Sequence, residues 1–197
     1  IAGILLATSL FSQGFRKRLT LEEGIISNIW LCNAPAGGLY AASFQNNTAA
    51  KYSLFLTKLS ATGDIEWTRK SNANRLGIGV TSDPDGNVYL VYETIANNAI
   101  SGVVVEKVSP AGQTLWQKKD DNNAFSLSYH ALSYHNGRLF VSNNSQQARR
   151  ITAFNSNSGS VVWTRLYDCT VPTVNDNIYQ LLALKDGSFL ATTQVAH

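Results

Sequence analysis

A glycine followed four residues later by a tryptophan occurs three times in this chain, at a near-constant interval. The three copies run from Gly63 to Trp67, from Gly112 to Trp116 and from Gly159 to Trp163, so the tryptophans are 49 and 47 residues apart. A repeat of this length is too short to be a domain but long enough for a four-stranded sheet. The chain is therefore predicted to consist of repeated sheets that stack on their neighbours.

A second pattern keeps step with the first, because an aromatic residue follows a turn glycine four times. These aromatic residues are Tyr40, Tyr89, Phe140 and Phe189. Within residues 76–119, apolar and β-branched runs at 76–82, 87–93, 100–108 and 113–119 are separated by short stretches rich in Gly, Pro, Asn, Asp and Ser. Such runs between such turns predict four antiparallel strands in a meander.

Sheets of four strands repeated at this period are typical of a β-propeller, which closes with four to eight blades. We predict an all-β chain with about 3.5 to 4 such blades. Propeller repeats are expected over residues 14–197, with blades at about 25–70, 76–119 and 125–166 and a partial blade at 177–197. An incomplete ring, as a fragment of a larger propeller, is favoured over a closed four-bladed one. Residues 15–18 resemble residues 67–70 and could supply an outer strand.

The charge pattern argues against nucleic acid as a partner. Net charge is +3, but Lys and Arg follow the periodic aromatic residues, as at Arg69, Lys118 and Arg165, and so are dispersed around the predicted ring. Only 15% of residues are charged, and a polar, uncharged, turn-rich surface favours a location outside the cytoplasm. The apolar stretch at 1–13 is too short to span a bilayer and is read as a signal-peptide remnant or as an N-terminal strand.

The two cysteines, Cys32 and Cys169, lie in different repeats and have no metal-binding or redox spacing. A disulfide between distant blades and two separate thiols both remain open.

The segment from Ala153 to Trp163 resembles the tryptophan-docking motif of pyrroloquinoline-quinone (PQQ)-type propellers, A-x-D-x-x-T-G-x-x-x-W, with Asn155 in place of Asp and Ser158 in place of Thr. The resemblance implies that Trp163 packs against the neighbouring blade, with Gly159 leaving room for close approach. The other two copies have a turn one residue tighter and are similar to secreted bacterial propeller repeats. The structural repeat residues are thus Gly63, Trp67, Gly112, Trp116, Gly159 and Trp163, and the resemblance identifies a fold rather than an activity.

Candidate chemical sites are few. The string from Asp83 to Asn87 has the oxygen side chains of a calcium loop, but its glycine is in the wrong place, so a tight hairpin turn is favoured. His130 and His135 are clustered, but an odd separation puts them on opposite faces of a strand unless a bulge intervenes. No catalytic, cofactor-binding or metal-binding residues are predicted. Asn46 and Asn143 start N-glycosylation sequons.

The predicted function is that of a non-enzymatic, extracytoplasmic propeller module that serves as a protein-interaction or structural scaffold of a secreted or cell-surface protein. Its partner would be another protein or the remainder of a longer chain, contacted through the loops 45–50, 94–99, 119–123 and 168–175. The alternative is the propeller portion of a quinone-dependent dehydrogenase or glycan-active enzyme whose catalytic residues lie elsewhere. Carbohydrate recognition by exposed tyrosines such as Tyr52 or Tyr92 is a third possibility.

Overall fold

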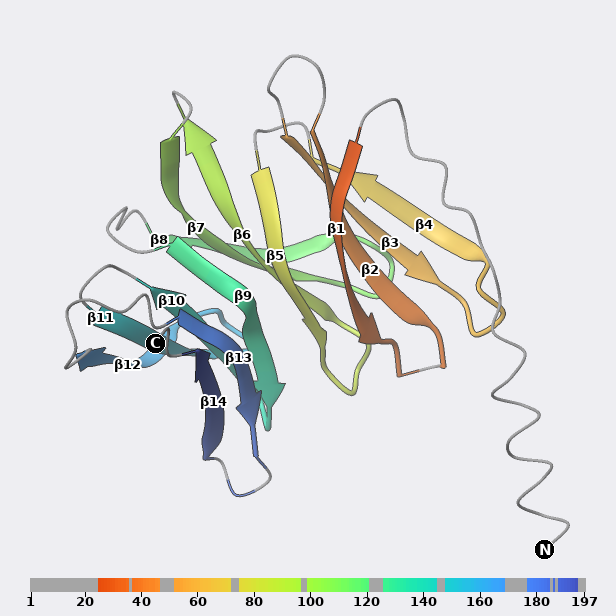
Figure 1. Ribbon diagram of the computed structural model, residues 1–197. Coiled ribbons are helices and arrows are strands. Elements are labelled where there is room, and N and C mark those ends of the chain that lie inside the picture. Colours follow the sequence, from red (N-terminus) through yellow and green to blue (C-terminus); the bar gives the residue numbers. More distant parts are fainter. Residues whose placement is uncertain are drawn as a thin grey trace, which may run out of the picture.

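A computed structural model describes residues 25–35, 37–46, 52–71, 75–96, 99–120, 126–144, 148–168, 177–184, 186 and 188–194 (Figure 1). Strands follow one another in three four-stranded sheets and one two-stranded sheet, here called blades 1 to 4. Blade 1 contains β1 (Ile25–Asn33), β2 (Leu39–Asn46), β3 (Tyr52–Leu59) and β4 (Ile65–Lys70). Blade 2 contains β5 (Arg75–Ser82), β6 (Val88–Ala96), β7 (Ala99–Val108) and β8 (Thr114–Asp120). Blade 3 contains β9 (Ser126–His135), β10 (Arg138–Asn144), β11 (Ala148–Asn155) and β12 (Val161–Asp168), and blade 4 contains β13 (Asn177–Ala183) and β14 (Phe189–Gln194).

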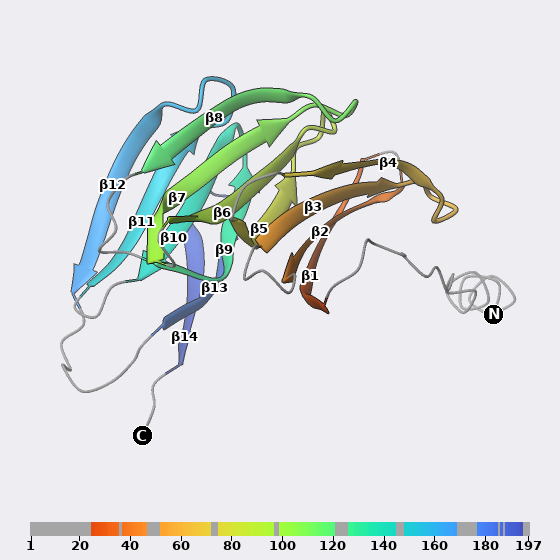
Figure 2. The same cartoon turned by 90° about the horizontal axis from the view of Figure 1, so that it is seen from above.

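Each blade is an antiparallel meander in which strands are hydrogen-bonded in sequence order. Figure 2 shows the blades fanned in an arc, with the first strands β1, β5, β9 and β13 on the inner side and β4, β8 and β12 on the outer side. The predicted all-β fold with four-stranded antiparallel blades is confirmed. Across the described residues, the four sheets form an open arc.

The first strand of every blade has an irregular register with the second strand. The shift falls at Ile26/Asn28 in β1, at Gly77/Gly79 in β5, opposite Val141/Asn143 in β9 and at Ile178/Gln180 in β13. An extra residue in one strand increases the local twist and bends that strand. The recurrence of this feature at the same place makes it part of the repeat.

The apolar core lies between blades and is divided into three clusters. One cluster joins blades 1 and 2 and includes Tyr40 and Val88, and a second joins blades 2 and 3 and includes Val105 and Leu139. The third joins blades 3 and 4 through Phe140 and Leu181, with Phe189 packed against it. Blade 2 therefore buries both faces, as expected for a sheet with a neighbour on each side.

The turn from Asp83 to Asn87 is a hairpin turn closed by the Gly86 N–H donating to the Asp83 carbonyl at 3.0 Å. Among the residues described, no group of three His, Cys, Asp or Glu side chains is placed to hold a metal ion. The side chain of His130 lies outside the described part, so its relation to His135 is not placed. The described residues also contain no helix long and apolar enough to cross a lipid bilayer. The N-terminal residues 1–13 and the 15–18 segment likewise lie outside the description.

Candidate functional site

A row of three side chains, of which the first and the last are aromatic, crosses the face that each blade turns toward the next. In blade 1 the register aligns Tyr40 with Lys58 and Lys58 with Trp67. Blade 2 repeats the row with Tyr89, Lys107 and Trp116, and blade 3 with Phe140, Ala153 and Trp163. Within each row the aromatic ring of the second strand lies about 6 Å from the indole of the fourth strand, at centroid distances of 6.0, 6.1 and 6.0 Å. Aromatic rings at such distances attract each other beyond their apolar burial.

The indole N–H groups of blades 1 and 2 donate to the backbone of the following blade. Trp67 Nε1 donates to the Pro110 carbonyl at 2.9 Å, and Trp116 Nε1 donates to the Ser156 carbonyl at 3.1 Å. Trp163 instead packs against Phe189 of blade 4, with ring centroids 6.3 Å apart. Each tryptophan thus contacts the blade that comes after its own.

The glycines of the second and third repeats receive the tryptophan of the preceding blade and not the one four residues after them. A Cβ on Gly112 would lie 3.3 Å from Trp67 Cδ2, and a Cβ on Gly159 would lie 2.9 Å from Trp116 Cε3. Both glycines also have positive φ, 83° and 68°, a conformation that favours glycine. Gly63 has a φ of 79° and is buried, but the residues that would precede blade 1 lie outside the described part.

The three tryptophans are partly buried. They lie on the outer strands β4, β8 and β12, and each contacts the next blade. The expected cost of removing one of them is therefore at the lower end of the range for large aromatic residues in cores.

A buried carboxylate holds blades 1 and 2 together outside the apolar cluster. Glu106 is 3% exposed and accepts hydrogen bonds from Arg69 Nη2 at 3.1 Å, from the Thr114 hydroxyl at 2.6 Å and from the Tyr92 hydroxyl at 3.1 Å. Arg69 comes from blade 1, and the other groups come from blade 2. The cation therefore makes an interblade ion pair, a role beyond the surface charge that its outer-strand position predicted.

A second buried group of polar residues lies where blade 2 meets blade 3. Tyr89 donates to Asp83 Oδ2 at 2.8 Å, and Lys107 Nζ lies 3.7 Å from the same oxygen. Asp83 Oδ1 also accepts from the Asn87 N–H at 2.8 Å, which fixes the hairpin turn. The Asp83 carboxylate is thus used inside the fold, and charge pairing is what makes its burial tolerable.

Two buried tyrosine hydroxyls and one partly buried thiol are held in their neutral forms. Burial raises the pKa of the Cys32 thiol to about 12, opposed by a hydrogen bond with Ser82. Burial also raises the pKa of the Tyr40 hydroxyl to about 12, and this hydroxyl donates to the Gly86 carbonyl at 2.6 Å. Burial, followed by the hydrogen bond to Asp83, raises the pKa of Tyr89 as well. Cys32 is a free cysteine, and Cys169 lies outside the described residues.

These pKa shifts predict that the chain loses stability at alkaline pH. Between pH 9 and about 12 the folded state keeps protons on Cys32 and Tyr40 that the unfolded state releases, so the free energy of unfolding falls as pH rises. Urea denaturation at pH 7, 9, 10 and 11 should show this decline. Tyr40→Phe should cost about 1 kcal/mol at pH 7 through its lost hydrogen bond and should make the decline above pH 10 shallower. A free energy of unfolding that is constant from pH 9 to 11 would contradict the prediction.

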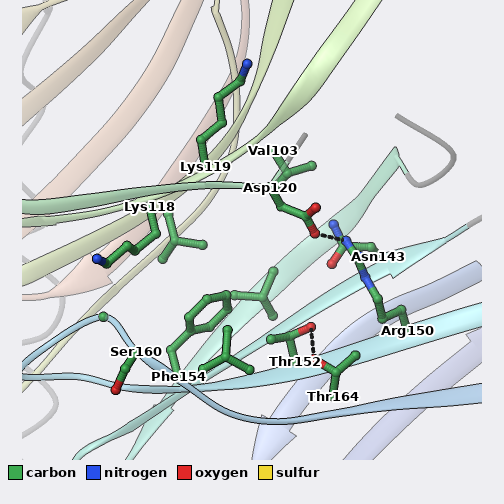
Figure 3. A pocket seen from close by; sticks show the side chains of 14 residues that line it. Val103, Lys118, Lys119, Asp120, Asn143, Arg150, Thr152, Phe154, Ser160 and Thr164 are labelled. Carbon is green, nitrogen blue, oxygen red and sulfur yellow. Dashed lines mark hydrogen bonds and ion pairs between the residues drawn. The ribbon is translucent and has the colours of Figure 1, made fainter. Parts of the chain in front are cut away.

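A cavity of about 520 Å³ opens between blades 2 and 3 (Figure 3). Its apolar wall includes Val105 and Phe154. Its polar lining comprises Lys118, Lys119, Asp120, Asn143, Arg150, Thr152, Ser160 and Thr164. Figure 3 places Lys118 and Ser160 toward one end and the Asp120–Arg150 ion pair with Asn143 toward the other. The lining holds three cations and one carboxylate, so the cavity is electropositive.

Two residues proposed from sequence for surface roles are buried. Tyr92 is fully buried, with its hydroxyl bonded to Glu106, so it is not an exposed platform for carbohydrate. Asn143 is 2% exposed, so its sequon is inaccessible to glycosylation in the folded chain. The side chains of Tyr52 and Asn46 and most of the proposed contact loops lie outside the described residues.

Sequence reasoning missed the cavity and its polar lining. The sequence pattern predicts only a glycosylation sequon at Asn143 and predicts no role for Arg150 or Thr152. The available signal was a difference between repeats: blade 3 has small residues where blade 2 has Tyr92, Glu106 and Gln117. These positions of blades 2 and 3 can be aligned only from the strand register, which the sequence does not determine.

Comparisons with known proteins support the architecture. Residues 101–194 match the model of a PQQ-type repeat family described as outer membrane protein assembly factor BamB. No curated protein sequence matches the chain.

Several solved structures have a similar fold. A protein of unknown function from Bacteroides caccae is similar over 87% of this chain and 54% of its own, with 13% identity and a TM-score of 0.54. A variant of an ACO/RPE65 chimera in a monoclinic crystal form is similar over 90% of this chain and 51% of its own, with 11% identity and a TM-score of 0.52. Cobalt-substituted Synechocystis ACO is similar over 83% and 42%, with 11% identity and a TM-score of 0.50. This chain spans about half the length of the first two structures.

The matched repeat family and the four sheets lead to the same assignment. The family match covers most of β7, all of β8, and blades 3 and 4, and blade 1 repeats the same strand order and aromatic row. The chain is a β-propeller repeat protein, and its residues 101–194 resemble PQQ-type repeats.

Proposed function

We propose that this chain is an extracytoplasmic propeller module that binds another protein and that it is not itself an enzyme. The observation that carries the proposal is the outer strand of blade 3. On β12 the side chains of Val162 and Leu166 are 45% and 61% exposed, and Val161 and Tyr167 are exposed as well. The outer strands β4 and β8 each expose only one large apolar residue among those described, Ile65 and Leu115.

An edge strand with adjacent exposed apolar side chains offers two kinds of contact to a protein partner. Its outward backbone N–H and C=O groups can pair with an added strand, and its side chains can be buried by that partner. β12 lies at the edge of its sheet. The matched family's description as an assembly factor supports a binding role, and the polar, weakly charged composition supports a location outside the cytoplasm.

The proposal includes an organisation of the chain. Residues 14–197 would form the propeller unit, as one part of a larger ring, and residues 1–13 would be either the remnant of a signal peptide or an N-terminal strand. The partner would be a protein or the remainder of a longer chain, and nucleic acid is not expected.

The test is site-specific photo-crosslinking in the cells that produce the protein. A photoreactive residue at position 166 should give one discrete adduct, identified by mass spectrometry, whereas the same residue at exposed position 115 on β8 should not. The purified partner should then bind the full chain, and Leu166→Ser should weaken this binding at least tenfold without changing the thermal midpoint. Equal crosslinking at both positions would contradict the proposal. Dye-linked alcohol oxidation after addition of pyrroloquinoline quinone and calcium would instead establish the dehydrogenase alternative.

A further inference from the structure

The cavity between blades 2 and 3 corresponds to a filled position between blades 1 and 2. The correspondence follows from the strand register, since Lys107 pairs with Trp116 in blade 2 and Ala153 pairs with Trp163 in blade 3. The residue before Lys107 is Glu106 in blade 2, and the residue before Ala153 is Thr152 in blade 3, so these two residues correspond. The position that holds a buried carboxylate in one interface therefore holds a short hydroxyl side chain in the next.

Two neighbours of this position are also smaller in blade 3, whereas a third is larger, because Arg150 stands where blade 2 has Val104. Tyr92 pairs with Val104 and corresponds to Asn143, which pairs with Arg150. Gln117, which pairs with Glu106, corresponds to Thr164, which pairs with Thr152. The replacements in blade 3 all line the cavity, namely Asn143, Thr152 and Thr164. The cavity exists because blade 3 lacks the side chains that fill the equivalent space in blade 2.

Blade 2 has a cation at the position that corresponds to Arg69 of blade 1. Arg69, two residues after Trp67, binds Glu106 across the first interface at 3.1 Å. Lys118 stands at the same place, two residues after Trp116, and lines the cavity. Within the described part of the chain, no carboxylate pairs with Lys118, whereas Asp120 is paired with Arg150 at 2.5 Å. The interface between blades 2 and 3 thus has a counterpart of the Arg69 cation but no counterpart of the Glu106 carboxylate.

The cavity also contains a buried hydrogen-bond donor. The side-chain amide nitrogen of Asn143 has no partner among the described residues, although Asn143 is 2% exposed. Leaving such a donor unsatisfied costs about 1 to 3 kcal/mol. Buried polar groups in native proteins are nearly always hydrogen-bonded, so an unsatisfied one that lines a cavity points to a ligand acceptor.

We propose that the cavity between blades 2 and 3 binds a carboxylate group supplied from outside the chain. The carboxylate occupies the place that Glu106 occupies in the preceding interface, between Lys118 and the hydroxyl of Thr152, and the ligand carries an acceptor for the Asn143 amide. A volume of about 520 Å³ is within the range of small-molecule sites. The carboxylate belongs to a free organic acid or to an acidic side chain of a peptide. This ligand site is separate from the proposed protein-binding role.

Isothermal titration calorimetry of the full chain at low ionic strength tests the proposal with three probes. These are glutarate, a capped tetraglutamate peptide and inorganic phosphate. We expect at least one carboxylate probe to bind, and the two probes distinguish the free acid from the peptide as the source. Lys118→Gln should weaken this binding at least about tenfold, equivalent to about 1.4 kcal/mol. Lys70→Gln removes the same charge from the outer strand of blade 1 and should change the affinity less than about twofold.

A second variant restores the internal anion. Thr152→Glu should place a carboxylate beside Lys118, as Glu106 is placed beside Arg69, and should abolish binding of the probe while near-ultraviolet circular dichroism stays native. Absence of heat with both carboxylates would overturn the proposal, as would equal affinities of Lys118→Gln and the unmodified chain. Tighter binding of phosphate than of either carboxylate would overturn the assignment of the ligand class. Crosslinking at position 166 is read out separately, so the two proposals fail independently.

Discussion

Replacement of Trp116 by alanine is expected to lower the free energy of unfolding by about 3 kcal/mol, the lower end of the range for large aromatic residues in cores. Trp116 covers Gly159 of the next blade, packs on Tyr89 at 6.1 Å and donates to the Ser156 carbonyl. Alanine removes the two contacts with blade 3 and the packing on Tyr89 within blade 2. Trp116→Phe keeps a ring over the glycine and loses the hydrogen bond, so it should cost about 1 kcal/mol. Urea denaturation followed by far-ultraviolet circular dichroism measures both changes.

The control is the residue next to Trp116 on the same strand. Leu115 is 52% exposed, and Leu115→Ala should change the free energy of unfolding by less than about 0.5 kcal/mol. If Trp116→Ala cost no more than Leu115→Ala, the indole would not be an interblade contact of energetic importance.

The repeat architecture was predictable from sequence because the features that define it are local. A turn glycine and a tryptophan four residues later are fixed by one hairpin, and the apolar alternation of each strand can be read over a few residues. The four predicted strands of 76–119 agree with β5 to β8 to within three residues at each end. The longer turn after β11 was also visible, and Asn155 Oδ1 accepts from the Asn157 and Ser158 N–H groups there.

The site was not predictable, because it depends on contacts between repeats. Sequence alone does not show that Gly159 receives Trp116 instead of Trp163, since the repeat motif places Gly159 and Trp163 in one hairpin. The face of Tyr92 depends on register, and the irregular pairing of each first strand makes register hard to count from the sequence. Predicting the cavity would require both the contacts between blades and the strand register, because the cavity arises from a difference between the interface of blades 1 and 2 and that of blades 2 and 3.

Replacement of Gly159 by alanine should destabilise the chain by about 3 kcal/mol, for two reasons that can be separated. Alanine at a φ of 68° costs about 1 to 2 kcal/mol, and its Cβ at 2.9 Å from Trp116 Cε3 displaces the indole. Gly137 is the matched control, because it has a φ of 73° but its added Cβ meets nothing closer than Ser156 Oγ at 3.9 Å. Gly137→Ala should therefore cost only the backbone strain.

A double-mutant cycle isolates the contact between the two blades. In a Trp116→Ala background the indole is absent, and Lys118 Cγ, 3.1 Å from the added Cβ, belongs to a flexible side chain that can move. Gly159→Ala should therefore cost little more than Gly137→Ala does in the unmodified chain. The difference, about 1 to 2 kcal/mol, is the coupling expected for residues in direct contact. Additive costs of Trp116→Ala and Gly159→Ala in chemical denaturation would show that the glycine is required only for its turn. Coupling of that size would show instead that glycine is required there because the preceding blade's tryptophan leaves no space for a side chain.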